Sequence, residues 1–149
     1  MKNNAAATVQ YAHITLSGGE TSYEFDLSTL PSGASAQLLE LSRQPLPEST
    51  DGLTASLTSF APFDTEPTLC EDVISIDAQD TAITITNVSG SDITGQIYVY
   101  YKSAYGDLYI GGITYRTGVS GLAAGESTTL YASHYSTAYS RIMFVTYVQ

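Results

Sequence analysis

The sequence predicts an all-β protein, an antiparallel β-sandwich of about ten strands. Three observations lead to this prediction. Apolar residues recur with a period of two, turn residues separate the apolar runs at regular intervals, and no segment carries the apolar stripe of an amphipathic helix. The chain of 149 residues, 43% of them hydrophobic, is long enough to bury a core.

The first half of the chain alternates apolar and polar residues in runs of strand length. In SYEFDL, Tyr23, Phe25 and Leu27 point to one side and the two acidic residues to the other. Turn-forming residues, such as SGG at 17–19, separate these runs. The pattern predicts strands over 11–16, 22–27 and 52–60, with an exposed proline-containing crossover over 44–52.

The second half continues the alternation. Gly111 and Gly112 lie inside the run YIGGITYR and predict a bulge or a close approach of two backbones. The last run, RIMFVTYV, is apolar on both sides, which is typical of a central strand covered on both faces. Residues 134–139 are expected to form a loop. The predicted strands are 73–78, 82–87, 95–102, 127–133 and 140–148.

No linker of distinct composition divides the chain. The segments 44–52 and 64–73 are long loops rather than domain boundaries with a change of composition behind them. We therefore expect a single domain over 1–149, and a division near residue 70 stays open as the alternative.

The charge of the chain excludes several classes of partner. The net charge of −10 argues against binding to nucleic acid or to an anionic membrane surface. Residues 1–97 hold thirteen acidic residues against Lys2 and Arg43, whereas residues 98–149 are close to neutral and hold ten of the twelve tyrosines. The two parts of the chain should therefore present different surfaces.

Neither a disulfide nor a membrane-spanning segment is expected. Cys70 is the one cysteine, which excludes an intrachain disulfide and a cysteine-cluster metal site. Residues 1–10 lack the apolar core of a signal peptide, and no run of about 18 apolar residues occurs. We expect no membrane insertion from these residues, and if the protein is exported its signal lies outside them.

Three segments of the second half carry a resemblance to a known family. Thr86–Ser89, Ile97–Lys102 and Gly121–Ser127 match a strand that ends in Asn, a strand that ends "vyyk" and a "GL.aGes" approach to a later strand. In these features residues 74–148 resemble bacterial immunoglobulin-like domains of the FxLYD and CARDB type. The resemblance implies that residues 72–149 form an immunoglobulin-like half.

The whole chain is also similar to uncharacterised envelope-associated proteins of Gram-positive gut bacteria. The matching pieces are an FD…LPSG segment at Phe25–Gly33 and the terminal SRIMFVTY. This similarity implies an extracellular or cell-envelope location. It supplies no catalytic residues to transfer.

The tyrosines are the most informative feature for function. If Ile97 and Val99 face the core, the residues between and after them face the opposite side of the strand. Tyrosine offers a large, rigid contact surface at low entropic cost, which suits recognition. The alternative is that these tyrosines are structural and covered by the rest of the chain. The expected binding residues on this side are Tyr98, Tyr100, Lys102, Arg116, Tyr131 and Tyr135.

Catalytic and metal sites are weakly supported. His134 lies between Ser133 and Ser136, but no Gly-x-Ser-x-Gly elbow occurs, so we predict that the chain is not an enzyme. His13 is expected on the surface, and a zinc site that joins it to His134 has no local HExxH or HxH spacing. The acidic cluster lacks a calcium-loop pattern and is explained by a solvated loop, so no cofactor or metal is predicted. It comprises Asp64, Glu66, Glu71, Asp72, Asp77 and Asp80.

These observations predict a non-catalytic interaction module that binds a protein or glycan at the cell surface through a tyrosine-rich face. The alternative is a self-assembling structural subunit of a surface layer or filament. Such a subunit would polymerise by adding a strand to a sheet edge, with residues 1–10 as the donor segment.

Overall fold

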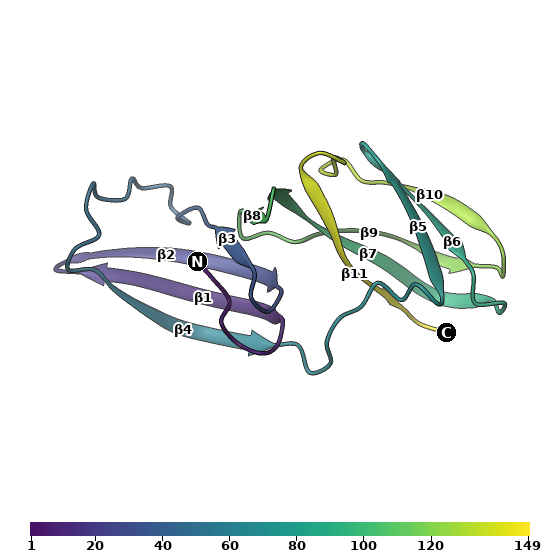
Figure 1. Cartoon of the computed structure of the whole chain (residues 1–149), viewed down its shortest axis with the longest axis horizontal. Helices are drawn as coiled ribbons and strands as arrows, with labels where there is room; N and C mark the ends of the chain where they lie inside the picture. The colour runs from purple at the N-terminus through teal and green to yellow at the C-terminus, as the bar shows by residue number, and fades with distance from the viewer. The chain divides into compact units, whose positions relative to one another are not determined.

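The computed structural model describes all 149 residues and contains eleven strands and no helix. The strands form three mostly antiparallel sheets, which confirms the all-β prediction (Figure 1). No element is a helix of the length and apolarity needed to span a membrane. The strands are β1 (Val9–Gly18), β2 (Thr21–Leu30), β3 (Ser35–Gln37), β4 (Thr54–Pro62), β5 (Ile74–Gln79), β6 (Ala82–Asn87), β7 (Ile93–Tyr105), β8 (Leu108–Ile110), β9 (Tyr115–Leu122), β10 (Ser127–Tyr131) and β11 (Ser140–Tyr147).

The chain divides into two compact units. The first comprises Met1–Glu66 and Gly106–Ile113, and the second comprises Pro67–Tyr105 and Thr114–Gln149. The first boundary therefore falls near the position at which the sequence left a division open. The chain also returns to the first unit for the short stretch that contains β8, which no composition signal predicted.

The first unit is built on the antiparallel sheet β2-β1-β4. The β1–β2 hairpin closes at the pair Gly18↔Thr21, and Gly19 takes the left-handed conformation that the two-residue turn requires, with φ of 62°. The unshifted register from this turn brings Ala12 opposite Leu27, and both side chains are fully buried. One face of this sheet is therefore apolar, as the alternation predicted.

Gly112 makes the close backbone approach that the glycine pair predicted. Its carbonyl oxygen accepts hydrogen bonds from the backbone N–H of Ser28 at 2.7 Å and from the Ser28 hydroxyl at 2.9 Å. A Cβ atom at Gly112 would overlap the carbonyl oxygen of Asp26. The neighbouring β8 pairs in parallel with β3, so this returning stretch of chain is fixed to the first unit at two places.

The second unit encloses one hydrophobic core between two groups of strands, β10-β6-β5 and β11-β7-β9 (Figure 1). The central strand β7 pairs with β11 on one side and with β9 on the other. Both groups send alternate side chains into the core, as sheets packed face to face do. The fully buried aliphatic members of this core are Ile74, Ile83, Ile85, Ile93, Ile97 and Val99.

Asn87 fixes the turn that follows β6. Its fully buried side-chain amide donates to the carbonyl oxygens of Ser91 at 2.7 Å and Leu122 at 2.9 Å, and its Oδ1 accepts from the backbone N–H of Ser89 at 3.0 Å. The turn at residues 88–92 is therefore held by one buried amide that satisfies three backbone groups.

The expectation that the last strand is central was wrong. β11 pairs with β7 alone, and outside that pairing the Val145 N–H donates to the carbonyl of Thr68 at 2.9 Å. The strand is apolar on both sides for another reason. A register shift between Ile142 and Phe144 leaves Val145 in the core and Phe144 on the opposite side, where its ring stacks on Tyr100.

The contact at Gly112 generates a stability prediction. Gly112→Ala should lower the free energy of unfolding by about 1–3 kcal/mol, because the added methyl group forces the backbone away from Asp26. The matched control is Gly111→Asn. Gly111 has φ of 77° and open space around its Cα, and asparagine tolerates that conformation, so this change should cost about 1 kcal/mol or less. Urea denaturation of both variants measures the difference, and equal losses would contradict the explanation.

Candidate functional site

The alternation along β7 separates a core side from a tyrosine side. Ile97 and Val99 are fully buried in the core, and Tyr98 and Tyr100 lie on the opposite side of the strand, half-buried. This part of the predicted arrangement agrees with the structure. The Arg116 side chain joins the two tyrosines from β9, since Arg116 pairs with Tyr100 in the register.

Tyr98 and Arg116 form the most defined contact on this side. Gly118 pairs with Tyr98, and a Cβ atom at Gly118 would overlap the Ile97 carbonyl and crowd the Tyr98 ring. The absence of a side chain there lets the ring lie close over β9. The guanidinium carbon of Arg116 lies 4.7 Å from the centre of the Tyr98 ring, within the range of a cation–π contact.

Tyr100 extends this arrangement in two directions. Its ring lies edge-on to Tyr98 at 6.4 Å and stacks on Phe144 at 4.2 Å. Phe144 is buried and Arg116 is exposed, so access to the row increases from Phe144 toward Arg116. We define the Tyr98 patch as Tyr98, Tyr100 and Arg116.

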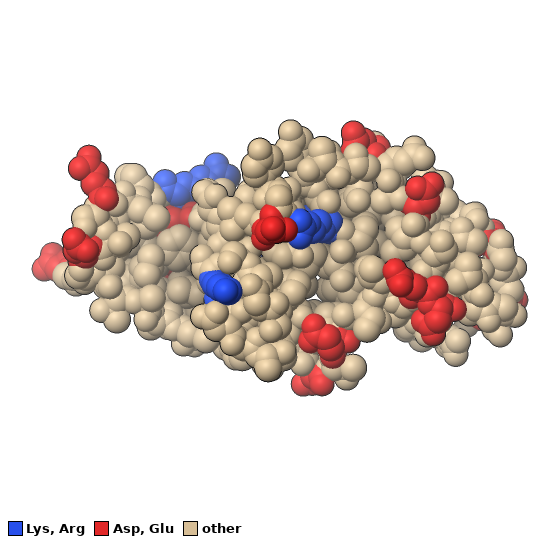
Figure 2. Space-filling model, in the orientation of Figure 1, with Lys and Arg blue, Asp and Glu red and all other residues tan.

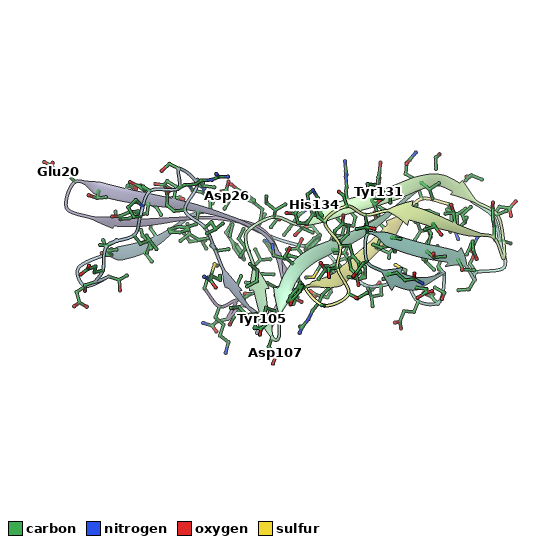
Figure 3. All side chains as sticks on the ribbon, turned by 90° about the horizontal axis from the view of Figure 1, so that it is seen from above. Glu20, Asp26, Tyr105, Asp107, Tyr131 and His134 are labelled. Carbon is green, nitrogen blue, oxygen red and sulfur yellow. The ribbon has the colours of Figure 1, made fainter.

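The structure does not bring the other three predicted residues into this patch. Lys102 lies on the same side of β7 but is fully buried, and burial lowers the pKa of its amino group to about 8. Tyr131 is on β10, in the other group of strands, where it is 76% exposed and stands out from the ribbon (Figure 3). Tyr135 is buried in the core with its ring edge-on to Tyr101, and burial raises the pKa of its hydroxyl.

The expectation that Tyr131 and Tyr135 share the Tyr98 side was therefore wrong. Its cause is the pairing of β10, which adds to β6 rather than to β9. Alternation within one strand fixes the relative side of its own residues, but it does not say which sheet the strand joins.

His134 is engaged in aromatic packing. Its ring stacks on Tyr115 with the ring centres 4.6 Å apart, and Tyr115 stacks in turn on Tyr101. The hydroxyl of Ser140 donates to the backbone carbonyl of His134 rather than to its ring. The His134 ring is therefore held by aromatic packing.

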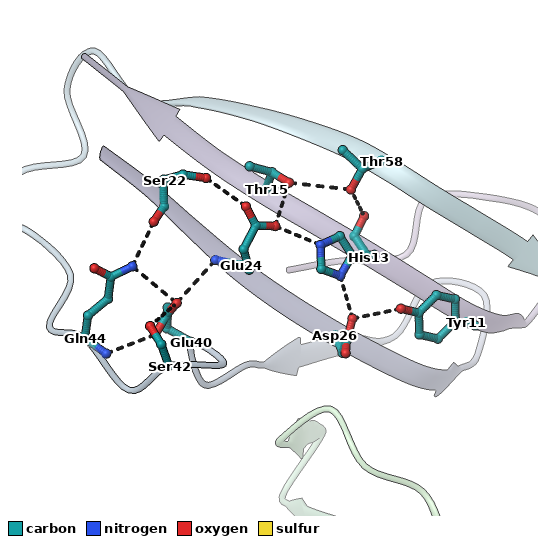
Figure 4. Close-up of polar contacts among 10 residues, drawn as sticks. All are labelled: Tyr11, His13, Thr15, Ser22, Glu24, Asp26, Glu40, Ser42, Gln44 and Thr58. Carbon is teal, nitrogen blue, oxygen red and sulfur yellow. Dashed lines mark hydrogen bonds and ion pairs between the residues drawn. The ribbon is translucent and has the colours of Figure 1, made fainter. Parts of the chain in front are cut away.

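His13 is the centre of a polar cluster that the sequence analysis missed. Its Nδ1 lies 2.6 Å from Asp26 Oδ1, and its Nε2 lies 2.7 Å from Glu24 Oε2 (Figure 4). The hydroxyl of Tyr11 donates to Asp26, and that of Thr15 donates to Glu24. All five residues come from the β1–β2 hairpin, on the face opposite its apolar side.

The cluster favours a doubly protonated imidazole. Both ring nitrogens face carboxylate oxygens, and only the imidazolium can donate to both. The hydrogen bond to Asp26 is the main cause that raises the pKa of His13, and Glu24 adds to it. The hydrogen bond from His13 is the main cause that lowers the pKa of Asp26, whereas Ser22 and Thr15 do most to lower the pKa of Glu24.

A third carboxylate, that of Glu40, is held beside this cluster. Glu40 is buried and accepts hydrogen bonds from the Ser42 hydroxyl at 2.9 Å and from the Gln44 N–H at 3.0 Å (Figure 4). Burial acts to raise the pKa of its carboxyl, but the hydrogen bonds from Ser42 and Gln44 outweigh it and lower the pKa. These contacts fix part of the long segment between β3 and β4.

The acidic cluster of residues 64–80 is not gathered around one point. Glu66 accepts from the backbone N–H and hydroxyl of Thr8, which lower the pKa of its carboxyl. Asp80 accepts from the backbone N–H and hydroxyl of Thr137, with the same effect on its pKa. No group of three or more His, Cys, Asp or Glu side chains is arranged to hold a metal ion.

Neither a protein-family model nor a curated protein nor a solved structure matches the chain. The resemblance to bacterial immunoglobulin-like domains and the suggested envelope location are therefore carried by the sequence motifs alone.

The His13 cluster generates a pH prediction. The pKa of His13 is raised above its ordinary value of 6.5, so its stabilising contribution is complete below pH 6.5 and is lost as the pH rises through the folded-state pKa. NMR titration of the His13 ring should give a pKa above 6.5. In the parent protein the free energy of unfolding should therefore fall as the pH rises from 6.5 through the folded-state pKa of His13, and His13→Gln should remove this fall. A His13 pKa at or below 6.5 would contradict the doubly paired geometry.

Proposed function

We propose that the chain is a non-catalytic interaction module that binds a protein or glycan partner through the Tyr98 patch. The observation that carries the proposal is the Arg116 guanidinium, exposed at the surface and held 4.7 Å over the centre of the Tyr98 ring. Long arginine side chains lose entropy on binding, and one already held by an aromatic ring loses less. The patch is therefore pre-organised.

The chemistry of the patch indicates the ligand group that it suits. Arg116 offers planar N–H donors, which match the geometry of a carboxylate or sulfate. The net charge of the chain is −10, and acidic side chains predominate over basic ones on the face shown in Figure 2. An exposed arginine in such a protein is a local site for an anionic group, with Tyr98 and Tyr100 beside it to pack against the rest of the ligand.

The proposal includes an immunoglobulin-like architecture for the second unit and an extracellular or cell-envelope location. The architecture is supported by two groups of antiparallel strands around one core and by the resemblance of residues 74–148. The location is supported by the similarity to envelope-associated proteins. The non-catalytic character is supported by the histidines, since His134 is stacked on Tyr115 and His13 is paired at both nitrogens.

Self-assembly by strand addition is the second candidate function. It is favoured by β4, an edge strand that pairs with β1 alone and carries no charged residue. Its proposed donor, residues 1–10, is engaged in the first unit. The Met1 amino group donates to the Ala36 carbonyl at 2.9 Å, and Lys2 forms a bridge with Ser35. Donation to another copy would require these contacts to break.

Binding to acidic ligands tests the Tyr98 patch. We expect the protein to bind carboxylated or sulfated glycans, or acidic peptides, on an array that also carries neutral members. Arg116→Ala and Tyr98→Ala should each weaken that binding about tenfold or more, because each removes half of the pre-organised pair.

Tyr131→Ala is the matched control, since Tyr131 is an exposed tyrosine on the other group of strands. It should leave binding unchanged, and circular dichroism should show all three variants folded. Equal losses from Tyr98→Ala and Tyr131→Ala, or no loss from Arg116→Ala, would contradict the proposal.

Light scattering separates the two candidate functions. An interaction module should give the molar mass of one chain, 15.9 kDa, in light scattering. Self-assembly would give larger species, and their formation should increase with salt as repulsion between the acidic chains is screened. Assembly that disappears when residues 1–10 are deleted would favour the structural subunit.

A further inference from the structure

The edge strand β4 of the first unit lacks two of the usual protections against added strands, charged residues and a proline in the strand interior. It lies at one end of the sheet β2-β1-β4, and its outer edge pairs with no strand (Figure 1). Exposed edges of natural proteins are commonly blocked by charged residues, by proline or by a bulge. β4 has no charged residue, and its one proline, Pro62, is its last residue.

A bulge divides this edge into two parts. The register with β1 shifts between His13 and Ile14, so Thr58 has no partner of its own. The hydroxyl of Thr58 is bound to the carbonyl of His13 at 3.2 Å. The longer regular part is Thr54–Leu57, and the shorter part beyond the bulge, Ser59–Ala61, is followed by Pro62.

An apolar groove adjoins the same part of β4. We call it the β4 groove. It has a volume of about 610 Å³, and Leu57, which is 54% exposed, forms part of its rim. Ala55 and Ser56 line it as well, so the free edge and the groove are contiguous. Its other apolar walls come from the sheet and from the segment before β4, and they include Ile14, Leu16, Phe25, Leu38 and Leu46.

A free edge beside an apolar groove suits an extended peptide. The backbone of an added strand can pair with Thr54–Leu57, and every second side chain then points to the groove side. Those side chains must be apolar to fill the groove, and the intervening ones remain in solvent. A compact or helical ligand could use the groove but would leave the edge unpaired.

The charge around β4 indicates what flanks the added strand. The first unit holds nine acidic residues against Lys2 and Arg43, a net charge of −7. Asp51 precedes β4 and Asp64 follows it. A second copy of the first unit carries the same net charge of −7, so pairing two β4 edges would bring like charges together, which is unfavourable. Basic residues at the ends of the added strand are complementary to this charge and to Asp51, which lies three residues before the paired part.

We propose that β4 and the β4 groove bind an extended segment of a partner protein, in which apolar and small polar residues alternate and basic residues flank the strand. This surface belongs to the first unit and is independent of the Tyr98 patch, so the failure of one proposal leaves the other standing.

A designed peptide tests the proposal. The probe is a synthetic peptide of alternating valine and threonine with lysines at both ends, labelled for fluorescence anisotropy. We expect saturable binding to the full chain. Two versions with N-methyl groups on one or the other alternate set of amides should show the backbone requirement, since the set that faces β4 cannot donate. At least one should bind about tenfold more weakly or worse.

Two further comparisons test the charge and the place of binding. Replacing the terminal lysines of the probe with glutamates should weaken binding about tenfold or more at low salt. Leu57→Lys should do the same, because it puts a charge on the groove side of the edge. Leu39→Lys is the matched control, since Leu39 is 76% exposed and does not line the groove.

Three results would overturn the proposal. The first is that the lysine-flanked probe does not bind. The second is that both N-methylated versions bind as tightly as the unmethylated probe. The third is that Leu39→Lys weakens binding as much as Leu57→Lys does. A dimer of the protein alone that Leu57→Lys dissociates would also overturn it, because a second copy would then be the occupant of the edge.

Discussion

The register of the β1–β2 hairpin is the constraint on which both faces of the first unit depend. The strands pair without a shift from Gly18↔Thr21 to Ala12↔Leu27, so the conformation of Gly19 at the turn fixes every cross-strand neighbour. A slip of β2 by one residue relative to β1 would exchange the two faces of β2. Leu27 would then face solvent, and Glu24 and Asp26 would turn away from His13. The apolar groove and the His13 cluster are thus two consequences of one turn.

In the second unit β7 has the corresponding role. It pairs on both sides, and its alternation puts Ile97 and Val99 in the core while it places Tyr98 over Gly118 on the opposite side. The core fixes the strand, and the strand fixes the ring that holds Arg116. A contact at the surface is therefore positioned by burial on the other side of the same strand, which keeps the Tyr98 patch on a rigid element.

Much of this arrangement could be predicted from the sequence, because alternation and turn chemistry are local. The positions of most strands, the turn at 17–19 and the close approach at Gly112 follow from residues near each other in the chain. The strands β3, β8 and β9 were not among the predicted ones, since β3 and β8 are only three residues long and β9 carries no fully regular apolar alternation. The His13 cluster was within reach of the same argument, since a two-residue turn after Gly18 pairs His13 with Asp26 and Thr15 with Glu24. The places of Tyr131 and Tyr135 were not, because which strand β10 joins depends on packing between distant segments.

The charge of the chain favours different ligands at the two proposed surfaces. The second unit holds six acidic residues against three basic ones, a net charge of −3, and exposes Arg116, so an anionic group meets an arginine with modest repulsion around it. The first unit, at −7, would repel the same group, and its β4 groove offers apolar side chains and backbone instead. Charge mainly affects the rate at which a ligand associates with each proposed surface, and backbone pairing or aromatic contact mainly affects the rate at which it dissociates. On the two proposals, an anionic ligand and an apolar extended segment would therefore not compete for one surface.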